Sequence, residues 1–411
     1  MKVKFDALYG AEAAGQRERY EEIRRGFAEK FGDEEGAVFF SAPGRTEVGG
    51  NHTDHNHGRV LAAAVNLDIV GLARKTDSDV VLLKSAEYTR TDTVRLDQLD
   101  KQEGELNSQA LVRGILARCK ELGYRVGGFE CYTKTRVLKG SGLSSSAAFE
   151  ILVVTIVSEL FNDGAIDPVT AAIIAQYAEN VYFEKPSGLL DQMAASVAGF
   201  TAIDFKDPAH PVIDKVDFDF ASSGHVLCVV DTGGNHADLT PEYAAIPAEM
   251  KAVAKYFGKE FLRDVDEREF YDHLGEVRKV TGDRAVLRAM HFFDEDRTAS
   301  QEAAALKRGD FAGFKKMIRA SGVSSYERLQ NVFPVTAPAE QGLSLALALS
   351  QRLLGDDGAF RVHGGGFAGT IQAFVPAEKL EAYRAGMEKV FGEGTCHVLS
   401  IRPAGGTQVE L

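Results

Sequence analysis

A run of small residues that leads directly into an apolar stretch constrains this chain more than any other feature. Residues 140–148 read Gly-Ser-Gly-Leu-Ser-Ser-Ser-Ala-Ala, and EILVVTIVSEL follows at 150–160. Small residues let the backbone approach an anion closely, and the free N–H groups and positive dipole end of the following helix then point at it. The pattern predicts a phosphate cradle. A serine-capped helix after a glycine turn is the alternative that local preferences alone would give.

A second glycine-rich segment, residues 363–370, reads His-Gly-Gly-Gly-Phe-Ala-Gly-Thr. It contains a formal G-x-G-x-x-G, which indicates dinucleotide binding only when a strand precedes it and a helix follows. Here TIQAFVP follows and alternates like a strand, which disfavours a dinucleotide-binding fold. The first segment is not a Walker A loop either, because no lysine follows its glycines. We interpret residues 363–370 as a connection that shapes a nearby site.

Length and composition narrow the class of protein. At 411 residues the chain exceeds the usual size of one hydrophobic core, so two domains are expected, 1–220 and 221–411. The formal charge of −13 argues against general binding to nucleic acid or anionic membranes, although backbone N–H groups can still hold a phosphate. The N-terminus lacks the apolar core of a signal peptide, and no uninterrupted apolar run is long enough to span a membrane. A cytoplasmic location is the resulting expectation.

Strand and helix patterns are interleaved along the chain. Strands are expected at 37–44, 60–75, 80–88 and 370–376. Helices are expected at 11–31, 147–160, 168–183, 241–257, 284–314 and 377–391. The fold class is therefore α+β or α/β. The four cysteines are widely spaced without a C-x-x-C pair, so they are interpreted as buried free thiols.

A polar segment at 41–58 reads SAPGRTEVGGNHTDHNHG. Its histidines, His52, His55 and His57, together with Asp54 could bind a divalent metal, since imidazole and carboxylate are common metal ligands. A solvated surface loop and a site for a hydroxyl-rich ligand are the alternatives. The residues alone leave all three open.

A fourth group of polar residues joins Glu179 to the segment KPSGLLDQ at 185–192. Asp191 stands just before the apolar run MAASVAG, so a helix dipole would favour its ionised form. The carboxylate could serve as a base or a ligand. A role as helix N-cap is the local alternative.

Taken together and in order, APGRTEVGGNHTDHN, LKGSGLSSSAA, GLLDQ and HGGGFAG resemble the signature motifs of the GHMP kinases, and the first and third resemble the galactokinase branch. The resemblance spans residues from about 40 to about 370. It implies an α+β two-domain GHMP kinase fold, with a ribosomal-protein-S5-like N-terminal domain, a ferredoxin-like C-terminal domain and the active site in the cleft between them. It also implies a sugar 1-kinase that uses ATP and Mg²⁺.

Carried over by position, the resemblance implies roles for individual residues. Asp191 would lie beside the anomeric hydroxyl of the sugar with Arg45 near it, and Mg²⁺ would be held by Ser146 and Glu179. ATP would lie along Gly140, Ser141, Gly142, Leu143, Ser144, Ser145 and Ser146. The sugar would contact Asn51, His52, Asp54, Gly188 and Tyr243. Whether Asp191 removes the proton or orients the hydroxyl is not decided by the sequence.

The chain departs from the galactokinase pattern G-R-x-N-x-x-G-E-H-x-D-Y at three positions. It has Glu47 for the asparagine, Asn51 for the glutamate and His55 for the tyrosine. In the family that glutamate faces the C6 hydroxyl, and an amide would no longer repel a C6 carboxylate. The resemblance makes galactose the expected substrate. The change at Asn51 makes galacturonate, or another C6-modified sugar, the alternative. On this hypothesis Asn51→Glu should improve the use of galactose.

Three further alternatives follow from the same residues. The chain has no tryptophan and reads SQALVRG at 108–114, where many galactokinases have W-x-N-Y-V-x-G, so GTP as donor stays open. A sugar sensor without catalysis would keep the fold, but such sensors have lost residues of the serine run that are present here. A metal-dependent hydrolase would use the histidines. The expected partners are a sugar and a nucleotide, with neither nucleic acid nor membrane, and a monomer is compatible with the sequence.

Overall fold

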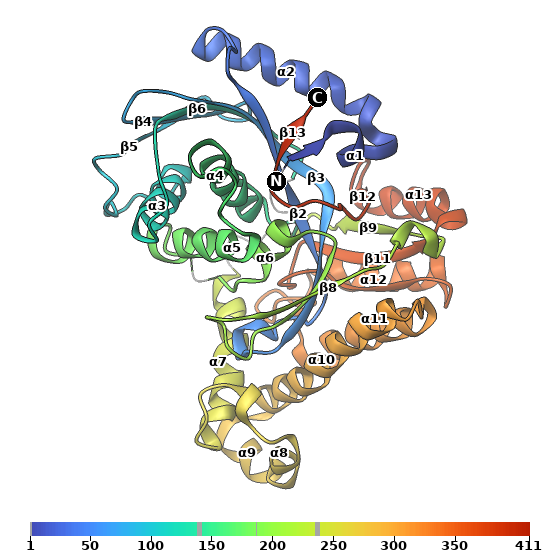
Figure 1. Cartoon of the computed structure of the whole chain (residues 1–411). Helices are drawn as coiled ribbons and strands as arrows, with labels where there is room; N and C mark the ends of the chain where they lie inside the picture. The colour runs from blue at the N-terminus through green and yellow to red at the C-terminus, as the bar shows by residue number, and fades with distance from the viewer. Residues whose placement is uncertain (1, 138–141, 186, 235–238) are drawn as a thin grey trace.

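The computed structural model describes residues 2–137, 142–185, 187–234 and 239–411, and it interleaves helices and strands, as expected (Figure 1). The strands are β1 (Lys2–Lys4), β2 (Val38–Gly49), β3 (Arg59–Lys75), β4 (Val80–Ser85), β5 (Thr91–Arg95), β6 (Phe129–Thr135), β7 (Phe200–Asp204), β8 (Val212–Val216), β9 (His225–Asp231), β10 (Ala359–Val362), β11 (Thr370–Pro376), β12 (Cys396–Leu399) and β13 (Thr407–Glu410). The helices are α1 (Phe5–Tyr9), α2 (Ala13–Phe31), α3 (Ser108–Glu121), α4 (Ser145–Asn162), α5 (Pro168–Tyr177), α6 (Leu190–Val197), α7 (Thr240–Tyr256), α8 (Glu267–Asp272), α9 (Leu274–Thr281), α10 (Asp283–Lys307), α11 (Phe311–Ser324), α12 (Gly342–Leu354) and α13 (Leu380–Phe391).

The strands form two sheets. The larger runs in the order β1-β13-β2-β3-β6-β4-β5, with β7 paired to β3 and β8 paired to β7. The smaller runs in the order β10-β11-β9-β12 and is antiparallel throughout. The first eight strands belong to the larger sheet and β9 begins the smaller one, but β13 returns from the C-terminal end to the larger sheet. A single cut near residue 220 therefore does not separate the two sheets, and that boundary stays a prediction.

The long antiparallel pair of β2 and β3 carries the chain from the larger sheet toward the second half of the molecule (Figure 1). Its register shifts between Pro43 and Arg45 and again between Glu47 and Gly49. Such irregularities bend a strand and re-aim its side chains, and they are frequent next to functional sites. Arg45 and Glu47 thus lie at the two ends of a short regularly paired stretch between these irregularities.

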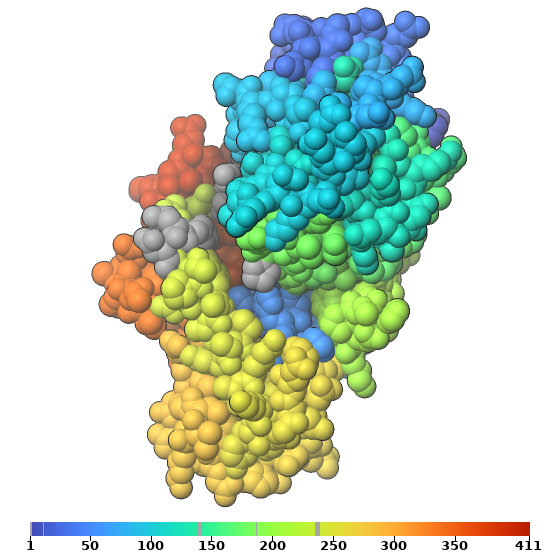
Figure 2. Space-filling view, turned by 90° about the vertical axis from the view of Figure 1, so that its left-hand side faces the viewer, coloured from blue at the N-terminus to red at the C-terminus, as the bar shows by residue number. Residues whose placement is uncertain are grey.

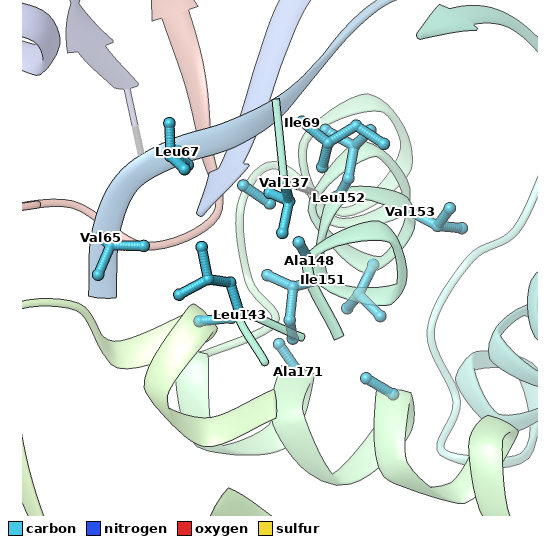
Figure 3. Packing of buried hydrophobic residues seen from close by; sticks show 14 of the residues in the cluster. Val65, Leu67, Ile69, Val137, Leu143, Ala148, Ile151, Leu152, Val153 and Ala171 are labelled. Atoms are coloured by element: carbon cyan, nitrogen blue, oxygen red, sulfur yellow. The ribbon is translucent and has the colours of Figure 1, made fainter. Parts of the chain in front are cut away.

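Helix α4 fills the centre of the N-terminal half. Figure 3 shows its residues Ala148, Ile151 and Leu152 packed beside Leu67 and Ile69 of β3, within one cluster of buried apolar residues. Among the described residues, α4 is the one helix long and apolar enough to cross a membrane, and 72% of that stretch is buried inside the protein. A core helix of a folded protein passes the same length test.

Two expected helices end earlier than their patterns suggested. The stretch expected at 284–314 is two helices, because Gly309 adopts a φ of +69° after α10 and Asp310 then caps α11 by accepting from the N–H of Gly313 at 2.8 Å. The stretch expected from Pro168 to Phe183 stops as an α-helix at Tyr177 and widens into one π-helical turn, Ala178–Tyr182. All four cysteines are free and buried, as expected.

A cluster of buried charged groups lies where the two halves of the chain meet. Arg361 of β10 has no exposed surface, and its guanidinium donates to Glu47 Oε1 at 2.8 Å and to the carbonyl of Val48 at 2.7 Å. Glu302 of α10 is also fully buried, and its carboxyl oxygens have no hydrogen-bond partner among the described residues. Burial, and next the charge of Glu295, raises the pKa of Glu302 well above its usual value. Burial without a partner therefore favours the protonated form of Glu302 in the folded protein.

This protonation predicts a dependence of stability on pH. The unfolded chain releases the Glu302 proton above about pH 4.5 whereas the folded chain keeps it, so its contribution to stability is complete below that pH and declines as the pH rises toward the folded pKa. The decline is about 1.4 kcal/mol per pH unit in that window. Glu302→Gln cannot ionise, so its free energy of unfolding should fall less between about pH 5 and pH 8 than that of the wild type.

Denaturant unfolding at a series of pH values measures this difference. The matched control is Glu103→Gln, because Glu103 is exposed to solvent and should leave the pH dependence unchanged. Equal pH slopes for wild type and Glu302→Gln would contradict a protonated Glu302.

Candidate active site

The centre of the candidate site is an ion pair between β2 and α6. Arg45 Nε donates to Asp191 Oδ1 at 2.7 Å, and the hydroxyl of Ser144 donates to Asp191 Oδ2. The guanidinium of Arg45 also donates to the carbonyl of Gly142. The side chain of Arg45 is 9% exposed and that of Asp191 is 30% exposed. A nearly buried cation therefore holds a carboxylate that still reaches the surface of the site.

The protonation state of Asp191 follows from these contacts. Burial raises the pKa of its carboxyl, but the charge of Arg45 and the hydrogen bonds from Arg45 and Ser144 outweigh it, so the net pKa lies below its usual value. Asp191 is ionised throughout the neutral range. It lies in the first turn of α6 after the N-cap residue Leu189, so its carboxylate serves the ion pair rather than a helix cap.

The start of α4 lies directly beside this pair. Ser144 is the N-cap residue with a left-handed φ of +53°, and its hydroxyl bonds Asp191 instead of capping the helix. Helix starts leave N–H groups without intrahelical partners, and the side chain of the N-cap residue Ser144 does not cap those of α4. Ser145 and Ser146 form its first turn, so this turn offers N–H groups and the positive dipole end to an anion.

Leu143 and Gly142 of the predicted phosphate segment are fixed by contacts with neighbouring residues. Leu143 is fully buried and lies in the core beside Val137 and Ala148 (Figure 3), and its carbonyl accepts from the N–H of Arg45 at 3.0 Å. Gly142 has a φ of +72°, and a Cβ there would lie 2.9 Å from His363 Nδ1. Only glycine therefore fits at position 142. Gly140 and Ser141 lie outside the described residues.

A second carboxylate, Glu179, faces the first turn of α4. It projects from the π-helical turn, is 2% exposed, and accepts from the hydroxyl of Ser146 at 3.0 Å. Lys185 Nζ lies 2.6 Å from its Oε1, while Ser187 Oγ and Gln192 Nε2 donate to its Oε2 at 2.6 and 2.8 Å. The predicted pair of Ser146 and Glu179 is thus brought together, with a half-exposed lysine beside it.

Asp54 and Gly188 approach each other closely. A Cβ at Gly188 would lie 2.1 Å from Asp54 Oδ2, so only glycine allows this approach. Asp54 Oδ1 accepts from the N–H of His55 at 2.9 Å, and its side chain is 15% exposed. The loop after β2 and the segment before α6 therefore form one wall of polar groups.

The triglycine segment at 364–366 lies against the same loop. His52 Nε2 donates to the carbonyl of Gly365 at 2.9 Å, and the hydroxyl of Tyr243 donates to that of Gly366 at 2.9 Å. Burial, and next the charge of His55, lowers the pKa of His52 to about 4, so its imidazole is neutral. Tyr243 stays protonated because burial raises its pKa to about 12.

Asn51 differs from the other residues expected against the sugar. It has no exposed surface, and both hydrogens and both lone pairs of its amide are used by protein groups, Glu47, Gly364, Asn331 and Ser325. The expectation that this amide reads the C6 position therefore has no support from its orientation.

The metal hypothesis for the histidines has no geometric support either. Among the described residues, no group of three His, Cys, Asp or Glu side chains is arranged to hold a metal ion. The ring of His57 instead stacks on Phe261 with centroids 3.7 Å apart. The imidazole of His52 donates its N–H to the carbonyl of Gly365 in the triglycine segment.

His363 and Gln192 also contribute to the site, although the sequence alone did not indicate them. His363 is 2% exposed and joins Thr46 at 3.0 Å to Thr370 at 3.0 Å, directly beneath Gly142. Gln192 bridges Glu179 to the buried Glu150 at 3.0 Å. Both residues stand inside the quoted motifs HGGGFAG and GLLDQ, so their position was the available signal.

Figure 2 shows this region from the side. Green residues of α4–α6 and yellow residues of α7–α9 flank a recess, and blue residues from the N-terminal part of the chain are visible within it. The site is thus built from both halves of the sequence, with the start of α4 next to a carboxylate that is ionised and partly exposed.

Comparison with known proteins supports the same assignment of motifs. The profile described as the galactokinase galactose-binding signature matches residues 25–75, and that of the GHMP kinases N-terminal domain matches residues 110–199. A galactokinase of Streptomyces coelicolor is 31% identical over 89% of this chain and 91% of its own length. A galactokinase of Streptococcus suis is 28% identical over 95% of this chain and 98% of its own length.

Solved structures give the corresponding result for the fold. The crystal structure of Lactococcus lactis galactokinase complexed with galactose superposes with a TM-score of 0.81 at 25% identity, covering 95% of this chain and 100% of that one. The mevalonate kinase of Methanococcus jannaschii shares the fold at a TM-score of 0.63 and 14% identity, over 89% of this chain and 99% of that one. The expected two-domain GHMP kinase fold is therefore confirmed.

Proposed function

Because the chain belongs to the galactokinase family of the GHMP kinases, we propose that it transfers the γ-phosphoryl group of ATP to the anomeric hydroxyl of galactose. The observation that carries this proposal is the Arg45–Asp191 ion pair next to the uncapped start of α4. A nucleophile beside Asp191 would lie within reach of a phosphate held at that helix start. A cytoplasmic location, where ATP is available, fits this activity.

Asp191 orients the attacking hydroxyl more than it removes its proton. Its pKa is held below the usual value, and a base works best when its pKa is near the working pH. Phosphoryl transfer passes through a loose transition state that depends chiefly on positioning and charge neutralisation. An ionised carboxylate that accepts a hydrogen bond from the anomeric hydroxyl meets that requirement, and Arg45 keeps the carboxylate in place.

The start of α4 binds the phosphate groups of the nucleotide. The N–H groups of Ser145 and Ser146 and the helix dipole attract the phosphate oxygens. Among the described residues, Arg45 and Lys185 are paired with Asp191 and Glu179, so their charges are already offset. A polyanionic nucleotide at this site would be stabilised by a further cation.

The residues present fit Mg²⁺ as that further cation. Ser146 supplies a hydroxyl and Glu179 a carboxylate, and such oxygen ligands suit magnesium. Lys185 already places a positive charge 2.6 Å from Glu179, at a position where a cation is stabilised. When bound between Ser146 and Glu179, Mg²⁺ would neutralise negative charge on the phosphate group. Gln192 keeps Glu179 oriented toward α4 through its 2.8 Å hydrogen bond.

The sugar binds against the wall formed by Asp54 and Gly188, with His52 and Tyr243 beside it. Asp54 accepts hydrogen bonds from vicinal hydroxyl groups, and the neutral His52 and Tyr243 present polar edges without adding charge. Galacturonate finds less support than galactose, because the amide of Asn51 is engaged by protein groups and cannot turn to a C6 carboxylate without breaking them. A sensor without catalysis is disfavoured because Arg45, Asp191 and the described part of the serine run are in place.

Replacing Asp191 tests the proposed reaction. Asp191→Asn keeps the size of the side chain but loses the charge, so kcat should fall by roughly 10²–10⁴-fold. The Kd for galactose, measured by calorimetry, should change by less than about fivefold, since the loss is in the transition state. ³¹P NMR of the wild-type reaction should show the phosphate on C1. Asp272→Asn, at an exposed position of α8, is the control that should keep full activity, and full activity of Asp191→Asn would refute the assigned role.

Replacing Gly188 tests the sugar wall separately. In Gly188→Ala the added Cβ would lie 2.1 Å from Asp54 Oδ2, so the carboxylate must move. The KM for galactose should rise by about tenfold or more, because hydrogen bonds to a charged group are lost, while the KM for ATP should not change. Gly275→Ala is the control, since nothing lies within 4 Å of a Cβ there. An unchanged KM for galactose would show that Asp54 does not contact the sugar.

A further inference from the structure

The amide of Asn51, in the loop 50–58 between β2 and β3, joins β2, the triglycine segment and residues 325–331. Asn51 Nδ2 donates to Glu47 Oε1 at 2.8 Å and to the carbonyl of Gly364 at 2.7 Å. Its Oδ1 accepts from Asn331 Nδ2 at 2.9 Å and from Ser325 Oγ at 3.3 Å. Both donor and both acceptor positions of the amide are thus filled. These four bonds require a side-chain amide, because an ionised carboxylate has no hydrogen to donate.

The backbone of Asn51 is held as firmly as its side chain. Its N–H donates to Glu295 Oε1 at 3.1 Å, and its carbonyl accepts from His291 Nε2 at 2.9 Å, both from α10. Asn331 extends the connection, because its amide also donates to the carbonyl of Gly365 at 3.1 Å. Asn51 therefore links the loop that carries His52 to the triglycine segment on which that imidazole rests.

Glu47 connects this amide to a buried cation. Its Oε1 accepts from both Asn51 and Arg361, the latter at 2.8 Å, and Arg361 has no exposed surface. A buried guanidinium without its counter-charge is costly, and so is a second carboxylate facing Glu47. The charge of Glu47 and the neutrality of Asn51 depend on one another.

We propose that Asn51 is a positioning residue for sugar binding, coupled to Glu47 and Arg361 in one unit, and not a residue that reads the sugar. The two departures from the galactokinase pattern at positions 47 and 51 are then a single change, because the carboxylate and the amide have exchanged places across one hydrogen bond. The exchange moves the negative charge from the loop to β2, where Arg361 neutralises it. The unit holds the carbonyls of Gly364 and Gly365 against Asn51 and His52.

This inference deepens the proposed function and rests on it for the sugar named. It predicts the opposite of a sugar-reading role for one variant. If Asn51 reads the C6 position, Asn51→Glu alone should improve the use of galactose. If Asn51 positions the loop, the same variant places a carboxylate against Glu47 and the carbonyl of Gly364, so binding of galactose should weaken.

A double-mutant cycle distinguishes the two. The variants are Asn51→Glu, Glu47→Asn and the pair combined, which conserves the charge and total side-chain length of the unit. Each single variant should raise the KM for galactose by about tenfold or more and lower the midpoint of thermal unfolding by roughly 5 °C or more. The KM for ATP should stay within about twofold, which a general loss of structure would not allow. The combined variant should return both quantities toward the wild-type values.

A matched pair serves as control. Asn66 lies on the same hairpin, and its amide donates to Glu12 at 2.6 Å and accepts from the N–H of Ser400 at 3.0 Å, away from Arg361. Glu47→Asn combined with Asn66→Glu should show no recovery. Improved use of galactose by Asn51→Glu alone, or additive effects of the two single changes at 47 and 51, would overturn the inference.

The unfolding measurements need no substrate, so they test the coupling even if another sugar proves to be the substrate. Failure of the wild type to phosphorylate galactose would count against the proposed function alone. Additive changes in the unfolding midpoint would count against the coupled unit alone.

Discussion

The ion pair between Arg45 and Asp191 is the interaction on which the site depends. It joins the irregular part of β2 to the first turn of α6, and the same two side chains bind Gly142 and Ser144 at the start of α4. The carboxylate is thereby ionised, oriented and placed beside the start of α4, where we propose that phosphate binds. Removal of either partner would leave a poorly solvated charge in the site, so Arg45, with help from Ser144, sets both the position and the protonation state of Asp191.

Much of this arrangement could be predicted from the sequence, because its signals are local. The small residues before an apolar run indicated the start of α4, and Asp167 before Pro168 is the cap of α5 with its side chain bonded to the N–H of Val169 at 3.0 Å. The order of four motifs pointed to the GHMP kinases, which the relatives confirm. The break at Gly309 was missed because charged, helix-favouring residues surround it and a single glycine is tolerated inside many helices.

The contacts between segments that are distant in the chain could not be predicted from the sequence. Asn51 was assigned to the sugar from its place in a motif, but its direction is set by Asn331 and Ser325, about 280 residues away along the chain. Likewise, nothing near Glu302 indicates that it is buried without a partner, because its burial results from packing against Gly49 of β2. A motif shows which residue types occur together, whereas tertiary packing decides which atoms face the ligand.

The central claim is that this site phosphorylates galactose at the anomeric hydroxyl. The most direct measurement follows ATP consumption by the purified protein with saturating Mg²⁺ and galactose, and with galacturonate in parallel, and identifies the product by NMR. We expect turnover of galactose to galactose 1-phosphate at a far higher kcat/KM than for galacturonate. Turnover of galacturonate without turnover of galactose, or a phosphate on any hydroxyl other than that of C1, would contradict it.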